Sequence, residues 1–461
     1  MKFTLASALL IFAPAAAAQS ASTDLARLSI AAGYKAAFTC SNMFNAGRTA
    51  EASDADDLAR VYPDLRDAIA GLPEAVVDRT SNSASVAFAA DQPPRVARWR
   101  PWLGCVQAPS GGERTGASPL RKPPDLRRAA WPRGDRITRP ILAETKQGAA
   151  LAAVVAAAFD ARSYGVGTET SAALVVRDGA IVAERYRKGF DLYTSQRTWS
   201  VAKSIWATVI GAAVEDGILR TEDKAGLAQW SGQIDPRREI TVDNLMRMAS
   251  GLDSSPSGNR TDDVYFGGGR IVDHATTRRL VSKPGARFVY ANNDTMILAR
   301  ALRERLMLQG DDAHLRYPIE KLLIPLGMTH TAMETDWNDD FVAASQVWTT
   351  ARDLARLGLL YLDGGSWEGR RILPEDWRSY VTEPSGPQPS QGPGYGAQFW
   401  LYGEKQGLPP GTFAAQGNRG QYLVIIPARN ILVIRRGFDA VGDGAAFDIA
   451  AFTRDVLAAI Q

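Results

Sequence analysis

The chain has 461 residues, of which 45% are hydrophobic and 22% are charged, and its formal net charge is +3. This length and composition are typical of a globular protein with one large or two modest domains and a sizeable core. The positive charge is small and spread along the chain, which argues against the dense basic face of a nucleic-acid-binding protein. We therefore expect no nucleic-acid partner, and the oligomeric state stays open.

Residues 1–18 have the pattern of a secretory signal peptide. Lys2 supplies a positive charge, residues 5–12 form a short apolar core, and alanines at 16–18 offer a cleavage site. The apolar run is too short for a stable transmembrane helix. We predict a periplasmic or secreted protein without a stable membrane anchor; an unprocessed helical N-terminus is the alternative.

The chain contains two cysteines, Cys40 and Cys105. In an exported protein they are expected to form a disulfide, and two buried free thiols are the alternative. Their spacing does not match a zinc site, and we find neither a phosphate-cradling loop nor a cluster of His and Asp. We expect no metal and no cofactor.

Composition divides the rest of the chain into three parts. Residues 19–110 form an N-terminal extension that the predicted disulfide would close. Residues 111–140 are rich in Pro, Gly and Arg, which is typical of a linker or an extended strap. Residues 141–461 form the main domain, in which a mainly helical insertion at about 221–340 separates β-rich segments. This order predicts a mixed α/β (α+β) fold with one sheet interrupted by helices.

The hydrophobic patterns predict the following elements in chain order. The extension is expected to hold helices at 24–38, 54–61 and 62–72, and strands at 85–89 and 96–99. The main domain is expected to begin with a helix at 149–160 and a hairpin formed by 172–176 and 180–186. After the insertion we expect a helix at 351–362, strands at 396–402, 422–426 and 430–435, and a helix at 446–460.

The first candidate for chemistry is Ser200, which lies three residues before Lys203 at the start of an apolar helical pattern over 201–214. Residues three apart share a helix face, so the amine of Lys203 can reach the hydroxyl of Ser200. Asp216 and Gly217 mark the expected end of the helix. The alternative is that Ser200 only caps the helix and Lys203 is a solvated residue of its first turn.

The second candidate is Tyr290, just before a helix that Asn292 or Asn293 would cap. A phenol is a poor base near its usual pKa of about 10, but an adjacent cation such as Lys203 lowers that pKa. The alternative is that Tyr290 is an ordinary packed residue whose hydroxyl is hydrogen-bonded locally. The three histidines, at 274, 314 and 330, occur in no recognisable triad context.

The third candidate is the glycine-containing segment at 417–422, ahead of a late strand. Its two glycines allow close backbone approach, and an edge strand can present N–H groups to an acyl oxygen. The alternative is that this segment is only a glycine-containing turn.

With these three motifs in this order, the chain resembles serine hydrolases related to class C β-lactamases. That superfamily includes penicillin-binding DD-peptidases, β-lactamase-type carboxylesterases and 6-aminohexanoate-dimer hydrolase. Further similar stretches lie at 199–204, 245–253, 284–290, 325–328 and 350–353. The resemblance covers about residues 165 to 460 and implies an antiparallel sheet flanked by helices, with a helical subdomain and a site between them.

The resemblance also implies roles. Ser200 would be acylated, Lys203 would lower the pKa of Tyr290 and help accept the serine proton, and Tyr290 would protonate the leaving group. Asn292 would orient Lys203 or the substrate. The backbone N–H groups of Ser200 and Gln421 would form the oxyanion hole.

Asn418, Arg419 and Gly420 occupy the positions at which penicillin-recognising members usually have Lys-Thr-Gly. The lysine that helps bind a β-lactam carboxylate is missing, and Arg419 is a candidate substitute. This departure favours a small ester or amide as substrate, with Trp199, Trp348, Tyr395 and Trp400 as candidate pocket walls. A β-lactamase or DD-peptidase is the near alternative, and a non-catalytic binding protein on the same fold is the distant one.

Overall fold

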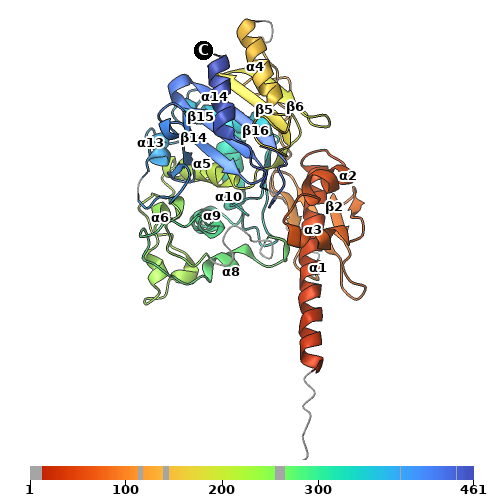
Figure 1. Ribbon diagram of the computed structural model, residues 1–461. Helices are drawn as coiled ribbons and strands as arrows, with labels where there is room; N and C mark the ends of the chain where they lie inside the picture. Colours follow the sequence, from red (N-terminus) through yellow and green to blue (C-terminus); the bar gives the residue numbers. More distant parts are fainter. Residues whose placement is uncertain are drawn as a thin grey trace, which may run out of the picture.

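The computed structural model describes residues 13–112, 118–138, 145–254, 265–384, 386–442 and 444–460 (Figure 1). Residues 1–12 of the predicted signal peptide lie outside the described residues. Within the described part of the chain, no helix is both long and apolar enough for a bilayer crossing.

A seven-stranded antiparallel sheet forms the centre of the main domain. Its order is β12 (Gly394–Tyr395), β13 (Trp400–Leu401), β14 (Phe413–Gly417), β15 (Gln421–Ile426), β16 (Ile431–Gly437), β5 (Thr170–Arg177) and β6 (Ala180–Tyr186). Strands β5 and β6 precede the helical insertion in the chain, and the other five follow it. The predicted sheet, assembled from both ends of the domain, is confirmed.

Helices cover both faces of this sheet because its buried strands carry apolar side chains on both sides. On β5, Ala173 and Val175 face the core formed with α4 (Lys146–Ala157) and α14 (Ile449–Ala459). Leu174 and Val176 face the opposite core, formed with α5 (Val201–Glu215) and α12 (Ala351–Leu362). Helix α5 is thus buried from Val201 to Ala213, which fixes its N-terminus beside the sheet.

The insertion forms a helical layer on the far side of α5 (Figure 1). Its main helices are α6 (Val242–Met246), α8 (Ile271–Thr276), α9 (Asn292–Leu306) and α10 (Ala313–Pro318). Apolar residues of α5, α6 and α9 belong to one core, so this layer and the sheet enclose α5 between them.

The N-terminal extension combines helices with a four-stranded sheet. It contains α1 (Ala13–Phe44), α2 (Ala50–Ser53), α3 (Pro63–Ala70), β1 (Val76–Asp78), β2 (Ser83–Val86), β3 (Arg95–Arg100) and β4 (Gly104–Gln107). The predicted disulfide between Cys40 and Cys105 is present and joins α1 to β4. The extension is not separate from the main domain, because its core also includes Phe266 and Trp348.

The segment after the extension is a strap rather than a flexible linker over its described residues 118–138. Arg356 of α12 donates hydrogen bonds to the carbonyl oxygens of Pro132 and Gly134, both at 2.7 Å, and to the Asp135 carboxylate at 2.8 Å. Trp131 also packs at the edge of the main core. These contacts hold the strap against α12.

The predicted strand at 396–402 is wrong, because Gln398 interrupts it in the left-handed conformation with φ of 62°. The Gln398 side chain is used elsewhere: it donates to the carbonyl oxygens of Leu245 and Met246 and accepts a hydrogen bond from Thr295. Two short strands, β12 and β13, flank the break.

Candidate active site

Ser200 lies at a sharp turn between β7 (Gln196–Arg197) and α5. Trp199 has φ of 50°, a strained conformation for a bulky residue, and such strain concentrates at functional sites. Ser200 itself already has helical dihedral angles, and its side chain makes no capping hydrogen bond. The alternative in which Ser200 serves only as a side-chain cap is therefore wrong.

Lys203 is buried one turn into α5 and its amine points at the Ser200 hydroxyl. Lys203 Nζ lies 3.1 Å from Ser200 Oγ, 2.6 Å from Asn292 Oδ1 and 3.1 Å from the carbonyl oxygen of Ala344. The alternative of a solvated lysine is wrong, since the residue is only 1% exposed. Asn292 and Ala344 fix the amine where it can accept the serine proton.

Burial lowers the pKa of Lys203 to about 7, because a charged amine loses its hydration inside the protein. The nearby Arg197 cation lowers this pKa further, and Asp294 opposes both effects. A substantial fraction of the lysine is therefore neutral near pH 7. A neutral amine at hydrogen-bond distance from a hydroxyl is suited to act as a general base.

We expect kcat/KM to rise with pH and to level off above an apparent pKa of about 7. Below that pKa, Lys203 carries a proton and cannot accept one from Ser200, so the rate falls about tenfold per pH unit. The measurement is a pH profile on a neutral ester. In Asp294→Asn the opposing carboxylate is lost, so the rising limb should move to lower pH; a flat wild-type profile between about pH 5 and 8 would contradict this assignment.

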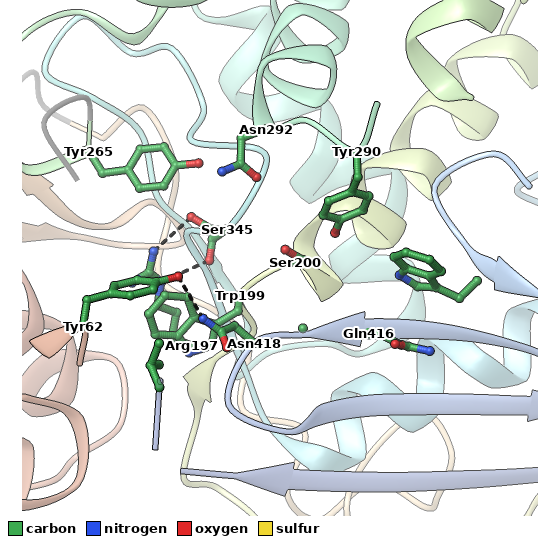
Figure 2. A pocket seen from close by; sticks show the side chains of 13 residues that line it. Tyr62, Arg197, Trp199, Ser200, Tyr265, Tyr290, Asn292, Ser345, Gln416 and Asn418 are labelled. Atoms are coloured by element: carbon green, nitrogen blue, oxygen red, sulfur yellow. Dashed lines mark hydrogen bonds between the residues drawn. The ribbon is translucent and has the colours of Figure 1, made fainter. Parts of the chain in front are cut away.

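Tyr290 lies just before α9, and its hydroxyl points toward Ser200 (Figure 2). Burial raises the pKa of Tyr290 above its usual value, and the hydrogen bond with Ser200 offsets only part of this rise. The expected lowering of the Tyr290 pKa by Lys203 is thus wrong: burial disfavours the phenolate and equally disfavours the lysine cation that would stabilise it. Lys203, not Tyr290, has the pKa of a base at neutral pH.

Asn292 is the first residue of α9 rather than its cap. Ala291 holds the N-cap position, so the predicted capping role of Asn292 or Asn293 is wrong. The Asn292 side chain is instead turned to Lys203, as the resemblance implied.

Ser200, Tyr290 and Asn292 share a cavity of about 390 Å³ with residues from the strands and from the extension (Figure 2). The remaining lining residues are Tyr62, Arg197, Trp199, Tyr265, Ser345, Trp400, Gln416, Gly417, Asn418 and Val441. Trp348 and Tyr395, which we expected as pocket walls, are each 2% exposed and pack behind the cavity instead.

The strand edge that faces Ser200 belongs to β14, whereas Gln421 begins β15. Strand β13 pairs with β14 only at Phe413 and Ala414, so the outer edge of β14 beyond Ala414 is left for the start of α5. A Cβ added to Gly417 would lie 3.1 Å from the Ser200 nitrogen. Gly417 and Asn418 line the cavity and Gln421 does not, so the expected oxyanion role of Gln421 is corrected.

Arg419 and Gly420 also lie away from the cavity. The Arg419 guanidinium is buried and donates to the carbonyl oxygens of Asp56, Asp57 and Asp439. A Cβ on Gly420 would clash with a guanidinium nitrogen of Arg435, so this glycine makes room for a buried arginine. The expected substrate contacts of Arg419 and Gly420 are corrected: Arg419 fastens the extension to the sheet.

We expect Arg419→Leu to lower the free energy of unfolding by about 3 kcal/mol. The change leaves three carbonyl groups without their buried donor and removes one of the two guanidinium groups beside the Asp57 carboxylate. Urea denaturation measures this loss, with the exposed Arg220→Leu as control. Unchanged stability together with a raised KM would restore the substrate role for Arg419.

Sequence reasoning missed several lining residues, including Tyr62, Tyr265, Ser345 and Gln416. Tyr62 comes from the turn before α3, and Ser345 from a loop before β9 (Val347–Thr349). No local pattern marks them, since only the tertiary fold brings them to Ser200. Arg197 carried one usable signal, its position three residues before the candidate nucleophile.

Comparison with known proteins identifies the family and the fold of the chain. The Beta-lactamase family matches residues 155–435, more than half of the chain, and the chain belongs to this family. It is 26% identical over 302 residues to the 6-aminohexanoate-dimer hydrolase of Paenarthrobacter ureafaciens, covering 58% of this chain and 72% of that one. The protein is accordingly a serine hydrolase.

Solved structures show the same fold. A class C β-lactamase matches with a TM-score of 0.52 and 15% identity, over 69% of this chain and 97% of that one. EstCE1, a hydrolase with promiscuous acyltransferase activity, matches with a TM-score of 0.52 and 16% identity, over 68% of this chain and all of that one (100%). The β-lactamase/DD-peptidase-like fold expected from the sequence is confirmed.

Proposed function

We propose that this serine hydrolase cleaves a small ester or amide through an acyl-enzyme on Ser200. The observation that carries the proposal is the 3.1 Å contact between Lys203 Nζ and Ser200 Oγ at the wall of the cavity. A weakly acidic hydroxyl becomes a nucleophile when a base of suitable pKa takes its proton, and a Lys203 with a pKa of about 7 is such a base.

In acylation, Ser200 Oγ attacks the substrate carbonyl carbon while its proton passes to neutral Lys203. The carbonyl electron pair moves onto oxygen, and we assign its stabilisation to the N–H groups of Ser200 and Asn418. When the tetrahedral intermediate collapses, the bond to the leaving group breaks. Tyr290, protonated at neutral pH, passes a proton to that group and is reprotonated by Lys203. Water then releases the acyl group by the reverse sequence.

An ester or amide is favoured over a β-lactam because no lysine lines the cavity among the described residues. The strand position beside Ser200 presents Gln416 and Gly417 instead. Penicillin-recognising members hold the lactam carboxylate with the lysine of their Lys-Thr-Gly motif. Asn418 occupies the matching position here, so we expect that contact with penicillins to be missing.

A substrate panel with wild-type protein tests the proposal. Short-chain para-nitrophenyl esters and the corresponding anilides should give turnover, and esters should show an initial burst if deacylation is slower than acylation. Benzylpenicillin should acylate slowly or not at all. Rapid penicillin hydrolysis without ester or amide turnover would make the protein a β-lactamase instead.

We further propose that the protein is exported, on the basis of the signal-like pattern of residues 1–18 and the disulfide between Cys40 and Cys105. The mass of protein purified from a secretion-competent host should correspond to cleavage after residue 18 and to the loss of two hydrogens at the disulfide. A full-length, reduced mass would contradict export.

A further inference from the structure

Among the described residues that line the catalytic cavity, it is Arg197 that carries a permanent charge. The other lining residues contribute hydroxyl, amide, aromatic, aliphatic or backbone groups, and no described carboxylate lies on the wall. The cavity is therefore electropositive on the Arg197 side, where the extension meets the main domain.

The guanidinium of Arg197 is fixed but not fully paired. It stacks 3.8 Å above the Trp199 ring, and it donates to the Ser345 carbonyl oxygen at 3.3 Å and to Ser345 Oγ at 3.0 Å. Arg197 Nη1 has no hydrogen-bond partner, and no described carboxylate lies within 4.0 Å of the guanidinium. A cation that is only 3% exposed normally has a paired anion, because its hydration has been lost.

Glu334 is the carboxylate whose pKa Arg197 lowers, but it neutralises the arginine only in part. Its Oε1 accepts hydrogen bonds from Ser41, Asn45 and the backbone of Cys105. Burial raises the pKa of Glu334 to about 7, so a large fraction of it is uncharged at neutral pH. Part of the positive charge at the cavity wall stays uncompensated.

We propose that Arg197, together with the hydroxyl groups of Ser345 and Tyr62, binds a carboxylate of the substrate. Tyr62 lines the same side of the cavity and accepts a hydrogen bond from Asn418 Nδ2 at 3.2 Å (Figure 2). One guanidinium and neutral hydroxyl groups match a singly charged carboxylate better than a phosphate dianion. The inference rests on the proposed function and narrows it to esters or amides that carry a carboxylate away from the scissile bond.

Two matched substrate pairs test this site. One pair places the charge on the acyl group: the para-nitrophenyl monoester of glutaric acid and its methyl-capped neutral form. The other places the charge on the leaving group: para-carboxyphenyl acetate and its methyl ester. In wild-type protein, kcat/KM should favour the carboxylate by about 10- to 100-fold in one pair, the range for hydrogen bonds to a charged group.

Arg197→Gln should bring that charged-to-neutral ratio close to one, and Arg197→Lys should keep part of the preference. The ratio is the readout because Arg197 also affects the pKa of Lys203, and this effect is common to both members of a pair. Arg220→Gln, at an exposed arginine, is the matched control and should leave the ratio unchanged.

Equal kcat/KM values in both pairs, or a ratio that Arg197→Gln does not change, would overturn the carboxylate site and leave the serine hydrolase mechanism intact. If Arg197→Gln does not fold, the charged-to-neutral ratios of the wild-type protein and of Arg197→Lys decide whether the carboxylate site exists. If no ester is turned over but a fluorophosphonate labels Ser200, protection by glutarate and not by glutaramide supports the site, and equal protection overturns it. Absence of both turnover and labelling would instead contradict the proposed function.

Discussion

Ser200→Ala is expected to lower kcat by at least about 10⁴-fold on any ester or amide that the wild-type protein hydrolyses. The hydroxyl supplies the oxygen that forms the acyl-enzyme, and alanine has no atom that can replace it. The rest of the cavity should persist, because the Ser200 side chain makes no capping hydrogen bond that the helix needs. The measurement is steady-state kinetics, with thermal unfolding to show that the fold is retained.

Ser204→Ala is the matched control for this variant. Ser204 is buried one turn further along α5, where its hydroxyl donates to the carbonyl oxygen of Gln398 at 2.6 Å, outside the cavity. Its loss should cost about 1 kcal/mol of stability and leave kcat within about threefold. If Ser200→Ala retained a rate close to that of Ser204→Ala, the nucleophile would have to be another group.

Lys203→Gln is expected to lower kcat by about 10²- to 10⁴-fold, the usual contribution of a general base. Glutamine has similar length and can hydrogen-bond Ser200 and Asn292, but it cannot take up the serine proton. The variant should also lose the rising limb of the pH profile near pH 7, a change that a purely structural role would not cause.

Lys35→Gln tests whether the loss of any buried lysine has the same effect. Lys35 is 5% exposed and lies in α1, in the extension. We expect its kcat and pH profile to match those of the wild type. A Lys203→Gln enzyme with an unchanged pH profile would show that another group takes the serine proton.

The pairing of Ser200 with Lys203 could be predicted from sequence, because Ser200 holds the N-cap position of the helix that contains Lys203 and the three-residue spacing fixes their relative position. The hairpin of β5 and β6 and the amphipathic α12 could be predicted for the same reason, since their signals are local. The disulfide also followed from composition, because only one pairing of Cys40 and Cys105 exists.

The strand that lies beside Ser200 could not be placed correctly from sequence, because β14 has the sequence Phe-Ala-Ala-Gln-Gly and lacks β-branched residues. Without that strand, the sequence did not distinguish the glycines at 417 and 420, so the candidate N–H group was placed at Gln421 and not at Asn418, to which we now assign it. The structure separates them: Gly417 lies against Ser200, whereas Gly420 lies against Arg435.

The pKa values of the site residues also depend on how deeply the tertiary fold buries them. The sequence showed a lysine and a tyrosine but not how deeply either is enclosed. Burial lowers the pKa of Lys203 and raises that of Tyr290, so the expected lowering of the Tyr290 pKa is not found and Lys203 is the better base near pH 7. The role of Arg419 could not be predicted from sequence either, because its partners Asp56 and Asp57 lie in the extension, far away in the chain.

The most direct test of the acyl-enzyme mechanism is the intact mass of the protein after reaction with a fluorophosphonate probe, followed by peptide mapping. The mechanism predicts one adduct per chain, located on Ser200 and absent from Ser200→Ala. A chain that stays unmodified, or an adduct on a different serine, would contradict the assignment of Ser200 as the activated nucleophile.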